Sequence, residues 1–113
     1  MFEIEVEDEG DVCVCRPKGE LDAMTVTEFR ERLIGLADQP LVIIDLGEVP
    51  FMDSTGLGAL IGGIRRIREA GGEVGVSCSR PAVLRLLHTT GFDRMVTVAD
   101  SVAEASAQLS AQR

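Results

Sequence analysis

The segment LVIIDL, residues 41–46, constrains the fold more than any other stretch of the chain. It is short, continuously apolar and rich in β-branched side chains, which is typical of a central strand covered on both faces. Apolar residues recur at helical spacing on both sides of it, over residues 26–37 and again over residues 57–67. A buried strand between two amphipathic helices predicts an α/β domain with a largely parallel sheet.

The N-terminal residues predict a hairpin that precedes this α/β pattern. Phe2, Ile4 and Val6 alternate with glutamates, and a second apolar run follows at residues 12–15 after a polar turn. Because proline has no backbone N–H, Pro17 is expected to end the regular pairing of the second strand or to place that strand at an edge.

The remaining elements alternate in the same way. The first helix is expected to begin with a capping box, Thr25 and Glu28, and to run to about Asp38. Strands are expected near residues 74–78 and 95–98, with one helix between them and another after a second capping box at the end of the chain. The predicted fold is a single domain over residues 1–113, with the order β-β-α-β-α-β-α-β-α. It has a mixed, mostly parallel sheet of four or five strands and about four helices.

Charge and composition argue against several classes of function. The formal net charge is −8, which disfavours nucleic-acid binding and adhesion to anionic lipid. No apolar run approaches the roughly 20 residues of a membrane span, so we expect no membrane insertion. The N-terminus lacks a signal-peptide pattern, so a cytoplasmic protein is expected. The cysteines, Cys13, Cys15 and Cys78, are expected to be free and buried, and with the single histidine, His88, they offer too few ligands for a metal site.

The stretch FMDSTGLGAL, residues 51–60, lies where the central strand gives way to a helix expected to begin near Ser54. In parallel sheets, functional sites gather where strand carboxyl ends meet helix N-termini, so this junction is the candidate site. A dinucleotide-binding loop is disfavoured, because the glycines after Gly58 come at the wrong spacing and no lysine follows. A hydrolase with Ser54 as its nucleophile is disfavoured because His88 is the only histidine. We therefore expect neither an enzyme nor a cofactor.

The glycines of this helix need an explanation beyond capping. Either Asp53 or Ser54 can cap the first turn. Four glycines within a helix (Gly56, Gly58, Gly62 and Gly63) nevertheless cost about 1 kcal/mol each against alanine. A helix tolerates that cost where another backbone comes close, in its own core or on a partner. We interpret Gly56 and Gly58 as making room for a partner, with internal helix–sheet packing as the alternative.

The residues around the junction closely resemble the bacterial anti-anti-sigma factors, which are single STAS domains. The resemblance rests on FMDSTGLGALIGGIRRIREAGGEV, residues 51–74, together with Gly19-Glu20-Leu21-Asp22 upstream. It extends to residues 81–92, where a helix that starts with proline ends at a Gly-Phe pair. It covers essentially the whole chain and implies one STAS domain over residues 1–113.

That resemblance implies an anti-sigma factor antagonist. In its dephosphorylated form, such a protein binds an anti-sigma factor that is also a serine kinase, and so releases the sigma factor. Phosphorylation of Ser54 switches binding off and a PP2C-type phosphatase restores it, with Thr55 as the second choice for the modified residue. The residues expected to meet the partner are Asp22, Asp53, Ser54, Thr55, Gly56, Leu57 and Gly58. The alternative is a STAS subunit that regulates a transport or other signalling assembly without a phosphorylation cycle.

Physical chemistry indicates how such a switch would act. A phosphate on Ser54 would add about −1.5 to −2 charges at pH 7. In the free protein a helix N-terminus favours that charge, whereas in a complex it would be buried against Asp22, Asp53 and the partner. The switch is therefore expected to act at the interface and not through refolding.

Overall fold

The strand predicted from LVIIDL is β3 (Leu41–Asp45), the middle strand of a five-stranded sheet ordered β1-β2-β3-β4-β5. The computed structural model describes residues 1–111. β1 and β2 form the predicted antiparallel hairpin, and β2 to β5 run parallel to one another. The other elements are β1 (Glu3–Glu9), β2 (Val12–Lys18), α1 (Val26–Ile34), α2 (Ser54–Glu69), β4 (Glu73–Ser77), α3 (Pro81–Thr89), α4 (Phe92–Met95), β5 (Thr97–Ala99) and α5 (Val102–Ala111).

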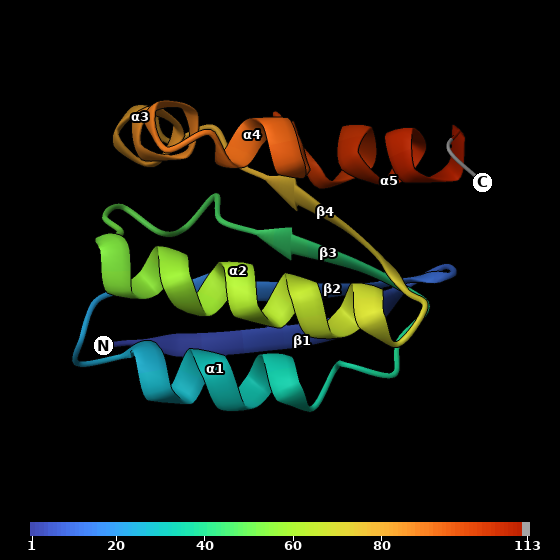
Figure 1. Cartoon of the computed structure of the whole chain (residues 1–113), viewed down its shortest axis with the longest axis horizontal. Coiled ribbons are helices and arrows are strands. Elements are labelled where there is room, and N and C mark those ends of the chain that lie inside the picture. The colour runs from blue at the N-terminus through green and yellow to red at the C-terminus, as the bar shows by residue number, and fades with distance from the viewer. Residues whose placement is uncertain (112–113) are drawn as a thin grey trace.

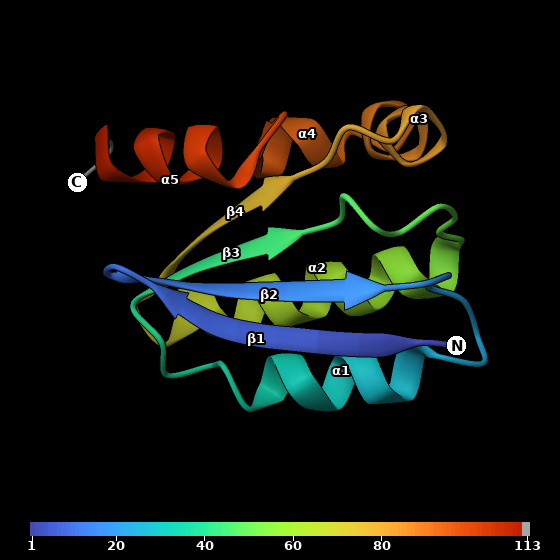
Figure 2. The same ribbon diagram turned by 180° about the vertical axis from the view of Figure 1, so that it is seen from behind.

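Helices cover both faces of the sheet, as a strand apolar on both sides requires. α1 and α2 lie side by side on one face, and α5 lies on the other (Figure 1; Figure 2 shows the reverse side). Alternate residues of β3 divide between the two layers: Val42 and Ile44 belong to the larger core with α1 and α2, and Leu41 and Ile43 to the smaller core with α5. The predicted α/β architecture is confirmed.

The order of elements matches the prediction except for one added helix, the single turn α4. The chain ends α3 at Thr89 and then passes through Gly91, whose φ of +79° is in the left-handed region. Phe92 follows and inserts into the larger core. The sequence analysis predicted Gly91 as the end of a helix, which is confirmed, but α4 is too short to leave a helical period in the sequence.

Pro17 is not at the edge of the sheet, so that part of the prediction is wrong. It lies within β2, paired with Ile4 of β1, and β2 is the second strand of the sheet. The parallel ladder to β3 covers only Cys13–Cys15. The absence of an N–H at Pro17 is therefore harmless on that side, because the ladder has already ended.

The first helix also departs from the prediction at both ends. Thr25 precedes α1 but makes no capping hydrogen bond: its hydroxyl donates to the Glu20 carbonyl at 2.7 Å and accepts from the Asp22 N–H at 3.2 Å. The predicted Thr25–Glu28 capping box is therefore wrong, and α1 ends at Ile34 rather than near Asp38. At the last helix, by contrast, the Ser101 hydroxyl does accept the Glu104 N–H at 3.1 Å.

Candidate functional site

The start of α2 is capped by Asp53, and this settles which side chain does the capping. Oδ1 of Asp53 accepts hydrogen bonds from the Thr55 N–H at 2.9 Å and the Gly56 N–H at 3.0 Å. Asp53 has extended backbone angles, with φ −104° and ψ −174°, as an N-cap residue requires. Ser54 is thus the first helical residue, as predicted, and its own side chain is not needed for the cap.

The Ser54 hydroxyl is free. Ser54 and Thr55 are both exposed, and within residues 1–111 neither hydroxyl has a hydrogen-bond partner. A serine at the N-cap accepts a backbone N–H of the first turn, but here Asp53 holds that position and Ser54 follows it. The site therefore presents two hydroxyl groups to solvent at the positive end of a helix dipole.

A second segment brings Asp22 to the same place. Leu21 forms a parallel β-bridge with Met52, in which the Leu21 N–H donates to the Phe51 carbonyl at 3.0 Å and the Asp53 N–H donates to the Leu21 carbonyl at 3.2 Å. The residue after Leu21 is therefore held beside the residue after Met52. Asp22, partly buried, is fixed there by its own Oδ1, which accepts the Met24 N–H at 2.9 Å.

Gly56 is explained by that bridge. A Cβ on Gly56 would lie 2.6 Å from the Leu21 carbonyl oxygen, which belongs to backbone already engaged in the bridge. Gly56 is thus required by close packing inside the protein, and its interpretation as room for a partner is wrong. Leu57 is buried as well, so neither residue contributes surface. Gly58 is exposed, and its absent Cβ would meet nothing within 4 Å.

Two exposed apolar side chains in the segments that carry Asp22 and Asp53 were not identified from the sequence. Met24 is 90% exposed and Phe51 is 48% exposed, and they belong to the two segments that the Leu21–Met52 bridge joins. A hollow of about 380 Å³ lies beside Met24, and Asp22 and Pro50 are also among its lining residues. The sequence does contain a signal for them: Met24 and Phe51 are large apolar residues in loop segments next to Asp22 and to Asp53–Thr55. Exposed apolar side chains beside such polar groups indicate a binding surface.

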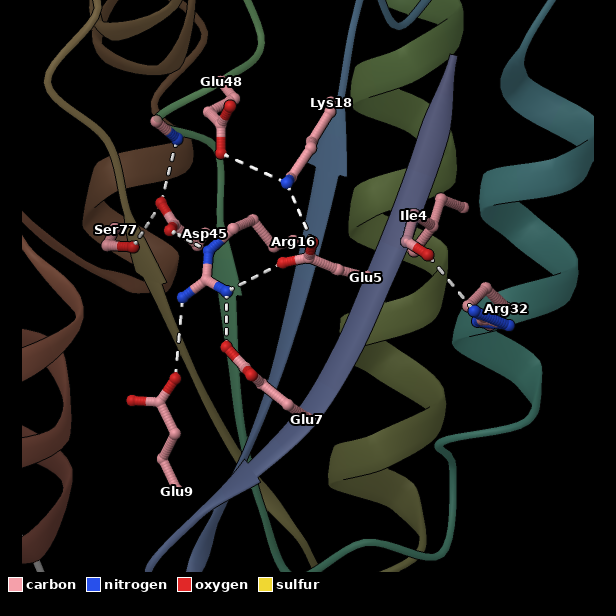
Figure 3. A network of polar contacts seen from close by, with 11 residues as sticks. Ile4, Glu5, Glu7, Glu9, Arg16, Lys18, Arg32, Asp45, Glu48 and Ser77 are labelled. Carbon is pink, nitrogen blue, oxygen red and sulfur yellow. Dashed lines mark hydrogen bonds and ion pairs between the residues drawn. The ribbon is translucent and has the colours of Figure 1, made fainter.

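The loop that leads into α2 starts from a firmly held residue, Asp45, at the end of β3. Oδ1 of Asp45 accepts the Gly47 N–H at 2.9 Å and the Ser77 hydroxyl at 3.0 Å, while Oδ2 accepts Arg16 Nε at 2.8 Å (Figure 3). Arg16 Nη1 also donates to Glu7 at 2.7 Å. The hydrogen bonds that Arg16 donates to the Asp45 and Glu7 carboxylates raise the pKa of its guanidinium. Side chains of β1, β2, β3 and β4 are thereby tied together where the loop begins.

The cysteines take no part in this site. All three are free and buried, as expected, and burial raises the pKa of the Cys15 thiol to about 12. The pKa values of Cys13 and Cys78 are also raised by burial, so the thiols stay protonated and unreactive at neutral pH. Within residues 1–111, no three His, Cys, Asp or Glu side chains gather as metal ligands would, and no helix is long and apolar enough to cross a bilayer.

Comparison with known proteins identifies the family. The family model described as "STAS domain" matches residues 3–105, which is most of the chain. The chain belongs to the STAS domain family. Among curated proteins, this STAS domain is 32% identical over 111 residues to the anti-sigma F factor antagonist of Paenibacillus polymyxa, covering 96% of this chain and 95% of that protein.

Solved structures agree with the fold. An anti-sigma factor antagonist from Mycobacterium paratuberculosis superposes with a TM-score of 0.89 at 27% identity, covering 96% of this STAS domain and 93% of that chain. The Bacillus cell fate determinant SpoIIAA, solved in its phosphorylated form, has a TM-score of 0.69 at 23% identity and covers 96% and 99% of the two chains. The second likeness shows a shared fold.

Proposed function

We propose that this STAS domain is an anti-sigma factor antagonist whose binding to an anti-sigma factor with serine kinase activity is switched off by phosphorylation of Ser54. The names of its relatives support the antagonist role. The observation that carries the site is the free Ser54 hydroxyl. It is exposed at the start of α2, and Asp53 already supplies the cap, so no structural role accounts for it.

The surface around Ser54 has the chemistry of a protein-binding site. Met24 and Phe51 offer exposed apolar area, and Asp22 and Asp53 offer carboxylates held in fixed orientations. Apolar anchors ringed by polar groups are typical of protein interfaces. The acidic groups fit a basic surface on the partner, in keeping with the net charge of −8.

A phosphate on Ser54 acts differently in the free protein and in the complex. In the free protein it faces solvent at a helix N-terminus, where backbone N–H groups and the helix dipole favour an anion. In the complex it is buried near Asp22 and Asp53, and like-charge repulsion and desolvation oppose it. Each 1.4 kcal/mol of that difference lowers the affinity about tenfold. A PP2C-type phosphatase then restores the binding form, in the cytoplasm.

The test is phosphorylation by purified anti-sigma factors encoded in the same genome, with Mg²⁺ and ATP, followed by mass-spectrometric mapping of the modified residue. We expect phosphate on Ser54, none on the Ser54→Ala variant, and undiminished modification of Thr55→Ala. Equal rates of modification for Ser54→Ala and the unaltered protein would overturn the assignment of Ser54. Absence of both modification and binding with every anti-sigma factor would overturn the proposed function.

A further inference from the structure

A second surface lies along α2, away from Ser54. It is a groove of about 250 Å³ beside α1. Gly58 and Gly62 of α2 lie in its floor. Its charged rim has Arg30 from α1, Arg65 and Arg66 from α2, and one acidic residue, Glu69, at the end of α2. α1 and α2 run side by side on the outer face of the larger core (Figure 1), so the groove faces outward.

Two glycines of this groove, Gly58 and Gly62, have no explanation within residues 1–111. A Cβ added to Gly58 or to Gly62 would meet nothing within 4 Å, whereas one added to Gly63 would overlap the Leu33 side chain. Glycine at an exposed helical position costs about 1 kcal/mol relative to alanine. Gly58 and Gly62 are one helical turn apart, and together they leave a strip of α2 with no side chains, against which another backbone can lie closely.

The charges around the groove are also unpaired. Within residues 1–111, Arg30, Arg65 and Arg66 form no ion pair and donate no side-chain hydrogen bond. Elsewhere Arg16 binds carboxylates and Arg80 binds the Gly47 carbonyl. Arg85 and Arg94 are as unpaired as the groove arginines within these residues, so it is the gathering of three arginines along one groove that distinguishes it. With three arginines against one carboxylate, Glu69, the groove is locally basic on a chain with a net charge of −8. Its complement is an acidic partner surface.

We propose that this groove docks an acidic helix of the anti-sigma factor, laid along α2. The inference rests on the proposed function. At 100° per residue, Ser54, Gly58, Gly62 and Arg65 lie within about 80° of one another around α2, and Ser54 and Arg65 are about 16 Å apart along its axis. A partner helix of three to four turns spans that distance. Its backbone lies over the glycines, and its carboxylates reach the three arginines.

A helix fits this groove better than a nucleic acid or a small anion. The net charge of −8 repels a polyanion such as nucleic acid over the rest of the surface. A small anion would bind the arginines, but its binding would not require glycine at positions 58 and 62. The groove also continues along α2 the row that begins at Ser54, so one partner can cover both surfaces, with basic groups facing Asp22 and Asp53 and the acidic helix over the arginines.

The experiment measures affinity for the anti-sigma factor that phosphorylates Ser54, with ADP in place of ATP so that Ser54 stays unmodified. Arg65→Glu/Arg66→Glu should weaken binding by about tenfold or more and reduce its dependence on salt. Gly62→Leu, which fills open space and should fold normally by circular dichroism, should weaken it by a similar factor. The matched control is Arg85→Glu/Arg94→Glu, the same charge change at exposed arginines of α3 and α4, which should stay within about twofold.

The outcomes separate this inference from the proposed function. If Arg65→Glu/Arg66→Glu binds as tightly as the unaltered protein while Ser54→Asp binds weakly, the groove is not a docking site and the switch at Ser54 stands. If the arginine variant is weakened but Gly62→Leu is not, the arginines act through long-range attraction, and the docked helix is wrong. If neither the unaltered protein nor any variant binds the anti-sigma factor, the proposed function itself is wrong.

Discussion

The two faces of α2 use the same residue type for opposite reasons. On the inner face, Gly56 and Gly63 lie where a Cβ would overlap Leu21 and Leu33 respectively. On the outer face, Gly58 and Gly62 border open space. The inner glycines are explained by the fold, and the outer ones by nothing within the described chain. The comparison teaches that a glycine-rich helix can combine a packing requirement and a partner requirement, and that only the contacts distinguish them.

Among substitutions at these glycines, Gly56→Ala should change the free energy of unfolding most. The new Cβ would lie 2.6 Å from the Leu21 carbonyl oxygen, and this backbone is held by the bridge to Met52. Because the backbone cannot move aside without breaking that bridge, we expect a loss of about 3 kcal/mol in the free energy of unfolding. Urea denaturation measures it. An unchanged midpoint would show that the start of α2 is looser than the structure indicates.

Gly58→Ala and Gly62→Ala should act in the opposite direction and more weakly. Each replaces glycine in an open helical position, so each should raise the free energy of unfolding by about 0.5–1 kcal/mol. Urea denaturation measures both changes, and Gly56→Ala on the inner face of α2 is the substitution with which they are compared. Destabilisation by either outer substitution would contradict the division of α2 into two faces.

Local patterns in the sequence predicted much of this fold. The continuous apolar run of β3, the helix start at Ser54 and the proline at the start of α3 are each encoded within a few residues. The errors have two sources. Pro17 is tolerated because the parallel ladder between β2 and β3 ends before it, which depends on a distant segment. The Thr25 hydroxyl turns to the Glu20 carbonyl, five residues earlier, because the chain makes a turn there in which a backbone acceptor competes with the helix cap.

The candidate site divides in the same way. Asp53, Ser54 and Asp22 were found from the motif, and the structure brings the segments that carry them together. The role of Gly56 was misread because the bridge between Leu21 and Met52 joins residues far apart in the sequence. The anchoring of the loop by Asp45 was missed for the same reason, since its partners come from β2 and β4.

The central claim is that charge added at Ser54 breaks a protein contact and leaves the fold intact. Its most direct test compares unmodified protein with protein fully phosphorylated on Ser54, by calorimetric titration with the ADP-bound anti-sigma factor and by thermal unfolding. We predict an affinity at least about tenfold lower for the phosphorylated protein, and melting temperatures within about 2 °C of each other. Equal affinities, or a lower affinity accompanied by a large fall in melting temperature, would contradict the account.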